Sequence, residues 1–453
     1  MTELPRLALA TPANGSEPAP ASLAMMAALA AHKWTIQHFR AWASPTASKL
    51  INHVSGRPGR HLDAWLMPSQ RACDVFLRGA RGSSLAIVEG TLDDPLPPVQ
   101  PCVFDRPGAV APLVETLNLP VLAVVDCRNL TNLHLPWVPP QADAVLLDGL
   151  ASRESFEACR GIISYVLKKP VIGAVEALPE IRDKLASTPP DQPVSPEHII
   201  PLAESFLRFA DLDALRTLAE SKPFPRTIEE AAPPVCGQHR FRVAYAMDEA
   251  FGAYFPDTLE ALESLGAELR EFSPLRSESL PGDVDLVMIG CGFPDCYAQD
   301  LAANMSLISA LRSFVCRGGR LYAESGGTAY LSRTMVIDGM IVPGAGIFPI
   351  SAERIGLPAI PSAIERELDR PSWLGPSGMI VRGYCSGRWA FHPAPEPDDC
   401  PARSGFLNPN HDLVFRKAAI GSRIHLHLGA LPNVVSAFAG HLSAPLAPPG
   451  PRR

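Results

Sequence analysis

Two cysteines that lie close together in the sequence are the first candidates for chemistry. Cys291 and Cys296 are five positions apart in the segment GCGFPDC. A structural zinc site needs four ligands, and neither a histidine nor a second cysteine pair accompanies these two. We therefore favour turn and packing roles over metal binding. Other cysteines are far apart, without metal-ligand spacing, and are expected to be reduced, small apolar side chains: Cys73, Cys102, Cys127, Cys159, Cys236, Cys316 and Cys400.

Length and composition indicate a globular protein of two domains. The chain has 453 residues, which is about three times a typical domain length. A net charge of −7 gives no positive surface for nucleic acid, so we expect no nucleic-acid partner. The N-terminal sequence has too short an apolar run for a signal peptide, and no stretch approaches the roughly 20 apolar residues of a membrane span. We expect a cytoplasmic protein with no membrane partner.

The first half alternates short apolar runs with amphipathic stretches, which is typical of parallel βαβ units. The predicted strands are residues 7–10, 85–88, 121–125, 144–147 and 171–174, and the predicted helices are residues 21–32, 71–81 and 155–168. These elements predict an α/β domain with a parallel sheet over residues 1–220.

A proline-rich segment without periodicity, residues 221–240, predicts a linker between two domains. The second domain is expected over residues 241–442, followed by a proline-rich tail, 443–453, that we expect to be disordered. Its predicted strands are residues 242–246, 268–272, 286–289 and 320–323, and its predicted helices are residues 257–265 and 301–316.

Long segments of the second half resemble the glutaminase domain of the cobyrinic acid a,c-diamide synthase family. They are AYAMDEAFGAYFPDTLEALESLGAELREFSPL, LVMIGCGFPD, LAANMSLISALR and RLYAESGGTAYLSR. In the first half, HLDAWLM, GSSLAIVEG and VLAVVD resemble that family's synthetase domain, a P-loop relative that activates a carboxylate with ATP and Mg²⁺. The resemblance covers nearly the whole chain. It implies a P-loop-like parallel-sheet domain followed by a class I glutamine amidotransferase-like, flavodoxin-like α/β domain.

The resemblance places the family's phosphate-binding loop at ATPANGSEPAPAS, which includes Gly15. A P-loop needs backbone N–H groups, a lysine and a hydroxyl. The match puts Pro18 at the lysine position, with Ala19 and Pro20 where hydroxyls belong. Proline removes an N–H donor, and Glu17 adds negative charge where phosphate would lie. We therefore expect poor ATP binding, or none.

The family's metal-binding acids are also altered at the positions that the resemblance identifies. Ser44 and Ala47 stand where two aspartates are expected, whereas Glu89 remains at the family's Mg²⁺ position. Asp93 and Asp94 follow it and could act as ligands, but aspartates before a proline are more often turn formers. No cofactor is expected, although ATP and Mg²⁺ would be needed if the chain is an active synthase.

The family's nucleophilic cysteine lies on a strand-to-helix elbow, and Ser325 occupies that position here, in ESGG. The paired histidines of the family match His425 and His427 in IHLHLGA. A thiol paired with histidine is deprotonated far more easily than a serine hydroxyl, although serine can act as a nucleophile when a histidine orients it. The resemblance also implies an oxyanion region at Gly290, Cys291 and Gly292. In a further family segment, Tyr384, Cys385 and Gly387 replace a histidine, a glutamate and a second histidine.

Three functions are compatible with these residues. We favour a non-catalytic relative that binds a corrinoid, another tetrapyrrole or a partner enzyme, with Asp63 and Trp65 lining a ligand cleft between the domains. Core packing is the alternative role for both side chains. The second function is an active ATP-dependent amidotransferase that uses Ser325 or free ammonia, and the third is a serine hydrolase that uses Ser325 with His425. The sequence leaves the ligand, the partner and the oligomeric state open.

Overall fold

The computed structural model of the chain describes residues 4–11, 20–42, 49–92, 108–128, 138–188, 195–225, 241–356, 361–394, 405–408 and 410–430. They fall into two compact units, one formed by residues up to 225 and the other by residues from 241 onward. Residues 226–240 of the predicted linker and the predicted tail, 443–453, lie outside the described residues.

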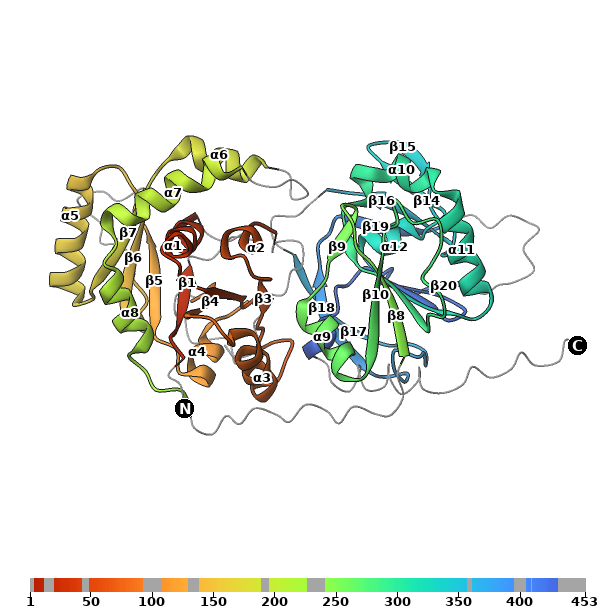
Figure 1. The fold of residues 1–453 in the computed structure, drawn as a ribbon, viewed down its shortest axis with the longest axis horizontal. Helices are drawn as coiled ribbons and strands as arrows, with labels where there is room; N and C mark the ends of the chain where they lie inside the picture. Colours follow the sequence, from red (N-terminus) through yellow and green to blue (C-terminus); the bar gives the residue numbers. More distant parts are fainter. Residues whose placement is uncertain are drawn as a thin grey trace, which may run out of the picture. The chain divides into compact units, whose positions relative to one another are not determined.

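The first unit is built on a seven-stranded parallel sheet with the strand order β3-β2-β4-β1-β5-β6-β7 (Figure 1). Its strands are β1 (Arg6–Thr11), β2 (Ile36–Arg40), β3 (Arg60–His61), β4 (Leu85–Thr91), β5 (Val121–Asp126), β6 (Ala144–Leu150) and β7 (Val171–Glu176). Its helices are α1 (Pro20–Ala31), α2 (Lys49–Ser55), α3 (Ser69–Ala80), α4 (Ala111–Leu117), α5 (Arg153–Ile162), α6 (Pro179–Ser187), α7 (Pro196–Phe209) and α8 (Leu212–Glu220). The predicted parallel-sheet α/β fold is confirmed.

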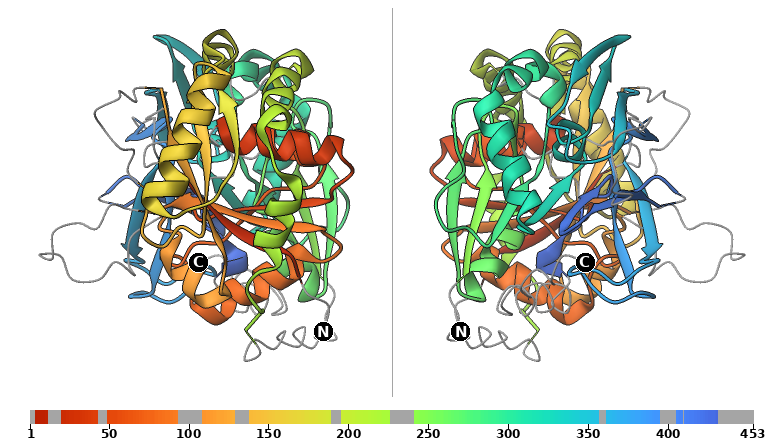
Figure 2. Two further views of the ribbon diagram at one scale, coloured as in Figure 1. Left: turned by 90° about the vertical axis from the view of Figure 1, so that its left-hand side faces the viewer. Right: turned by 90° about the vertical axis from the view of Figure 1, so that its right-hand side faces the viewer.

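Helices cover both faces of this sheet, as the two turned views show (Figure 2). Leu7 and Leu9 of β1 pack in one buried cluster with residues of α1, α7 and α8. On the opposite face, Val145 and Leu147 of β6 pack with Phe156 of α5. Strands buried on both faces carry apolar side chains at consecutive positions, which explains why these runs were readable in the sequence.

The second unit has its own seven-stranded sheet, in the order β10-β8-β11-β13-β22-β21-β20. The first five strands are parallel to their neighbours, and the last two pair antiparallel. The strands are β8 (Phe241–Ala246), β9 (Phe251–Ala253), β10 (Ala267–Phe272), β11 (Leu286–Ile289), β12 (Cys291–Gly292), β13 (Arg320–Glu324), β14 (Thr334–Ile337), β15 (Met340–Pro343), β16 (Ile350–Arg354), β17 (Ser362–Glu367), β18 (Ile380–Cys385), β19 (Trp389–Pro393), β20 (Gly405–Leu407), β21 (Leu413–Arg416) and β22 (Ala419–Ser422). The helices are α9 (Pro256–Ser264), α10 (Ala298–Ala303), α11 (Met305–Cys316) and α12 (Gly326–Tyr330), with short 3₁₀ turns η4 (Pro294–Tyr297) and η5 (Leu428–Ala430).

Two predicted helices differ from the structure in their bounds or their continuity. The helix predicted over residues 155–168 begins two residues earlier as α5 and ends in a π-helical turn, η3 (Ile163–Leu167). The helix predicted over residues 301–316 is divided at Asn304, whose side chain accepts a hydrogen bond from the backbone N–H of Leu307 at 3.2 Å and so starts α11. An asparagine at this position competes with the helix interior and favours a new N-cap. Among the described residues, no helix is long and apolar enough to cross a membrane.

Candidate functional site

Ser325 occupies a strained turn between β13 and α12. Its backbone angles are φ 44° and ψ −107°, which few residues with a side chain adopt. The turn is held by backbone hydrogen bonds, because Ser325 N donates to Ser422 O at 2.6 Å and Ala329 N donates to Ser325 O at 2.9 Å. A strained residue between a strand and a helix is the geometry of a nucleophile elbow. The structure therefore places Ser325 on an elbow, as the sequence predicted.

The two glycines after Ser325 allow the elbow to pack directly on the chain that follows β11. A Cβ atom added at Gly327 would lie 2.2 Å from the carbonyl oxygen of Ile289, and one added at Gly326 would lie 2.8 Å from that of Gly292. Both approaches are shorter than real Cβ contacts. The elbow and the segment 289–292 are consequently in backbone contact, which brings the predicted oxyanion region beside Ser325.

Cys291 lies against His425 in this region, although the two residues are 134 positions apart in the sequence. Cys291 Sγ is 3.7 Å from His425 Nε2, and both residues are 2% exposed. The pairing of β12 with β9 shifts its register at Cys291, an irregularity that can redirect a side chain. Among the described residues, no hydrogen bond joins Ser325 Oγ to His425. The histidine is therefore paired with a thiol on the neighbouring loop and not with the serine of the elbow.

Glu324, the last residue of β13, is the acid on the other side of the histidine. His425 Nδ1 lies 3.7 Å from Glu324 Oε2, a distance typical of an ion pair and too long for a good hydrogen bond. The other carboxylate oxygen of Glu324 accepts hydrogen bonds from the hydroxyl of Tyr322 at 2.7 Å and from the backbone N–H of Leu426 at 3.0 Å. Cys291, His425 and Glu324 thus form a buried row of thiol, imidazole and carboxylate, which we call the thiol–histidine row.

The charge of His425 is set by these neighbours. Burial alone lowers the pKa of its imidazole, but the charge and hydrogen bond of Cys291, together with Glu324, outweigh burial and raise the pKa well above its ordinary value. Cys291 and Glu324 therefore favour the protonated form of the imidazole. A protonated histidine next to a thiol stabilises the thiolate, which is the reactive form of cysteine.

The segment that carries Cys291 is anchored by a buried carboxylate. Asp295, with a side chain that is 3% exposed, forms ion pairs with Arg388 and with Arg354, the latter at 3.2 Å. The guanidinium of Arg388 also lies 4.9 Å from the ring centre of Phe293. These contacts fix residues 293–295, which immediately follow the Cys291 strand β12, to the segments around β16 and β18.

His427 has a different role from His425, although the sequence singled out both. Its ring stacks on Phe255 with centroids 4.5 Å apart, and its Nδ1 accepts a hydrogen bond from the backbone N–H of Ala430 at 3.0 Å. These two contacts of His427 position the chain after β22.

In the first unit, Glu89 at the end of β4 has protein partners on both carboxylate oxygens. Ser22 Oγ donates to Oε1 at 2.8 Å, and His38 Nε2 lies 2.7 Å from Oε2. All three residues are buried. His38 was not predicted as a site residue. A histidine inside the apolar strand IQHFR could have indicated a buried polar contact, because a buried polar side chain needs a partner. Gly15, Glu17, Pro18 and Ala19, as well as Ser44, Ala47, Asp93 and Asp94, lie outside the described residues.

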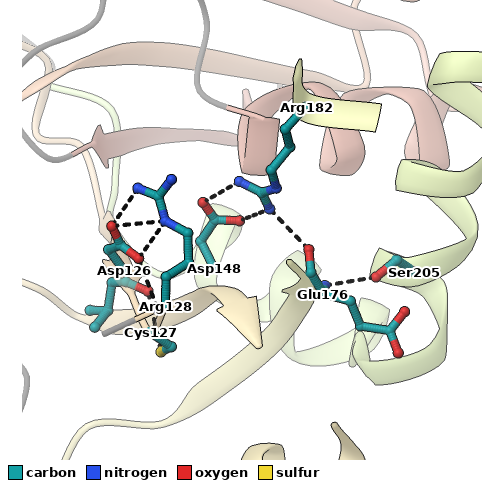
Figure 3. Close-up of polar contacts among 8 residues, drawn as sticks. Asp126, Cys127, Arg128, Asp148, Glu176, Arg182 and Ser205 are labelled. Atoms are coloured by element: carbon teal, nitrogen blue, oxygen red, sulfur yellow. Dashed lines mark hydrogen bonds and ion pairs between the residues drawn. The ribbon is translucent and has the colours of Figure 1, made fainter. Parts of the chain in front are cut away.

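Acidic side chains at the carboxyl ends of the neighbouring strands are also paired (Figure 3). Both oxygens of Asp148 accept hydrogen bonds from Arg182, at 2.6 and 3.0 Å, and the same arginine donates to the backbone oxygen of Glu176 at 3.0 Å. Asp126 is bound by Arg128, and this contact lowers the pKa of its carboxyl group. Across the described residues, no group of three histidine, cysteine, aspartate or glutamate side chains is arranged to hold a metal ion.

Asp63 and Trp65 lie in a turn that follows β3. Asp63 is 1% exposed, and its Oδ1 accepts a hydrogen bond from the backbone N–H of Trp65 at 2.8 Å. Its backbone oxygen accepts from Leu66 and Met67. The carboxylate thus organises its own turn, and a ligand-binding role for the two residues stays a prediction.

Comparisons with known proteins agree with these features of the fold. Residues 242–384 match the sequence profile of the CobB/CobQ-like glutamine amidotransferase domain. The chain is 30% identical to the cobyrinate a,c-diamide synthase of Magnetococcus marinus over 77% of each sequence. It is 27% identical to that of Syntrophotalea carbinolica, over 96% of this chain and 98% of the relative. A solved structure of a glutamine amidotransferase aligns with 44% of this chain and 98% of its own length, at 17% identity and a TM-score of 0.34.

Proposed function

The chain belongs to the cobyrinate a,c-diamide synthase family, and from that premise we propose that it is a ligand-binding or regulatory member that does not perform ATP-driven amidation with glutamine. The family gives the fold and a link to corrinoid chemistry. The altered site residues argue against the parent reaction. The observation that carries the proposal is the pairing of His425 with Cys291 at 3.7 Å, while the elbow position holds a serine.

The parent glutaminase step needs a nucleophile on the elbow and a histidine that takes its proton. Here the elbow hydroxyl has no hydrogen bond to the histidine within the described part of the chain, and the imidazole is engaged by a thiol and a carboxylate. A serine hydroxyl without such a base is a poor nucleophile at neutral pH. These contacts support loss of glutamine hydrolysis at Ser325.

The synthetase side supports the same conclusion. A carboxylate that coordinates Mg²⁺ presents its oxygens to the ion, whereas both oxygens of Glu89 are bound by Ser22 and His38. The sequence adds Pro18 in place of the P-loop lysine, so the charge that would hold the phosphates of ATP is missing. The contacts of Glu89 and His425, with Pro18 and Ser325 at their positions, support loss of both ATP use and glutamine hydrolysis.

We expect no measurable ATP hydrolysis by the purified chain, with or without Mg²⁺, and no heat of Mg-ATP binding in calorimetry. The physical reason is the occupied carboxylate of Glu89 together with the substituted loop. Phosphate release is the direct measurement. ATP turnover that is present in the wild type and lost in Glu89→Ala would contradict this prediction, since a contaminating enzyme would not respond to the substitution.

We also expect negligible release of glutamate from glutamine, and little or none after Ser325→Cys. A thiol placed on the elbow would still face a histidine that is already paired with Cys291. Glutamate production is measured for the wild type, for Ser325→Cys and for Ser325→Cys combined with Cys291→Gly, which removes the thiol that contacts His425. Glutamate release by Ser325→Cys alone would mean that the serine is the only change that prevents catalysis. It would refute our interpretation that the contact of Cys291 with His425 blocks the reaction.

A corrinoid or another carboxylated tetrapyrrole is the ligand class that we propose for this protein. The support is family membership together with the half-buried ring of Trp65, in a turn that the buried Asp63 organises. Absorbance titration with such pigments should give a dissociation constant below about 1 mM, a free energy near −4 kcal/mol. If every pigment fails at that concentration, the small-molecule proposal is wrong and a partner enzyme becomes the ligand to seek.

The strained conformation of Ser325 favours a second candidate, a serine hydrolase in the second unit, because such elbows present nucleophiles. A hydrolase needs a base next to the hydroxyl of Ser325, whereas His425 is in contact with Cys291 and Glu324. Covalent labelling of Ser325 by a fluorophosphonate would favour the hydrolase. Turnover with ammonia and ATP but without glutamine would instead favour an active synthase.

A further inference from the structure

Cys291 is a buried cysteine with an imidazole nitrogen next to its sulfur. Burial raises the pKa of the Cys73 thiol to about 11 and that of Cys127 to about 12, which leaves both as unreactive thiols at neutral pH. Cys291 is as buried as these residues, yet its sulfur lies 3.7 Å from an imidazole nitrogen. The proposed function does not use this thiol, and its contacts are those of an activated cysteine.

The histidine is held in position from its far side. Glu324 lies 3.7 Å from His425 Nδ1, and Glu324 is itself fixed by Tyr322 and by the backbone of Leu426. The backbone of His425 is bound as well, because its N–H donates to Tyr384 O at 2.7 Å. These contacts place the imidazole between the sulfur of Cys291 and the carboxylate of Glu324.

Burial limits what can react with this thiol. Cys291 and His425 are each 2% exposed, so a substrate of the size of glutamine cannot reach the sulfur without displacing protein atoms. A cavity of about 10 Å³ is lined by Gly290, which precedes Cys291, and by Glu324 of the row, whereas Cys291 and His425 are not among its lining residues. Such a cavity has room for about one water-sized molecule. Hydrogen peroxide is close to water in size and polarity.

We propose that Cys291 is a peroxide-oxidisable thiol, activated by His425 and Glu324 of the thiol–histidine row. The thiolate sulfur attacks one oxygen of the hydroperoxide, and the O–O bond breaks. The sulfur becomes a sulfenic acid, and the leaving oxygen departs as water after taking the proton of the His425 imidazolium. The cysteine loses two electrons, the peroxide gains them, and no further reactant is needed.

The test is differential alkylation of the whole chain without ATP, glutamine or pigment. The protein is treated with hydrogen peroxide at neutral pH, quenched, unfolded, and alkylated so that mass spectrometry reports which cysteines no longer carry a free thiol. Because alkylation follows unfolding, the reagent need not enter the folded site. We expect Cys291 to be oxidised about tenfold faster than the exposed Cys316 and far faster than the buried Cys73.

Two histidine variants separate activation from simple accessibility. His425→Gln should slow oxidation of Cys291 to the rate of Cys73, whereas His427→Gln, which alters a buried stacked histidine two residues away, should leave it unchanged. Oxidation of Cys291 in the wild type no faster than that of Cys73 would overturn the proposal, and this comparison needs no variant to fold. Equal rates in wild type and in folded His425→Gln would overturn it as well. Neither result bears on pigment binding, so this proposal and the proposed function fail independently.

Discussion

Gly327→Ala is expected to destabilise the second unit by about 3 kcal/mol, the upper part of the usual range for overpacking a buried site. The added Cβ would lie 2.2 Å from the carbonyl oxygen of Ile289 and 2.7 Å from that of Gly290. Both obstacles are backbone atoms, which cannot move aside as a flexible side chain can. Either the elbow or the end of β11 must shift, and β11 is the neighbour in the central sheet of β13, the strand that leads into the elbow.

The matched control for this variant is Gly282→Ala, in the same unit. A Cβ atom at Gly282 meets no heavy atom within 4 Å, so the change in stability should stay within about 0.5 kcal/mol. Urea unfolding followed by circular dichroism measures both variants. Equal midpoints for the two variants would show that the elbow does not pack on β11 as closely as the structure indicates.

Asp295→Ala is expected to cost about 3–5 kcal/mol, because it leaves a buried arginine without its counter-charge. Asp295 pairs with Arg388 and Arg354, and the side chains of Asp295 and Arg388 are only 3% and 9% exposed. Loss of the carboxylate should also release the segment that follows Cys291. Thermal unfolding gives the loss of stability, and the rate of Cys291 oxidation reports on the segment.

Asp338→Asn provides the control, since Asp338 pairs with the same Arg354 but is 74% exposed, and asparagine tolerates the left-handed backbone of this residue, φ 49°. An exposed ion pair contributes about 0–1 kcal/mol, so this variant should be nearly neutral. A second variant, Asp295→Ala with Arg388→Met, should recover part of the lost stability by removing the unpaired charge. If Asp295→Ala is as mild as Asp338→Asn, the buried pair does not anchor the segment.

The fold could be predicted largely because buried parallel strands leave a local signal. Runs such as VLAVVD and AVLLDGL are apolar on both faces, and their order along the chain implies the βαβ connections. The short strands after residue 324 had no such signal, since they alternate buried and exposed positions over four to six residues. The break at Asn304 depends on a single capping hydrogen bond and was also not predicted.

The candidate site could be predicted only in part, because its contacts join distant segments. The position of Ser325 between a strand and a helix was predicted from the family resemblance, whereas a catalytic role for Ser325 or His425 stays a prediction. The pairing of Cys291 with His425 depends on how β12 pairs with β9 and on the turn after β22, and neither is encoded near the cysteine. The same holds for His38 and Glu89, which are 51 positions apart and meet only because β2 and β4 are neighbours.

The backbone bonds of the elbow have a consequence for how this protein can evolve. Ser325 N to Ser422 O and Ala329 N to Ser325 O hold the turn through main-chain atoms, and the glycines beside it supply the room. No contact of the serine hydroxyl is required to maintain that shape. The shape of the turn therefore does not depend on the hydroxyl group of residue 325, so a single substitution there can exchange the nucleophile while the scaffold persists.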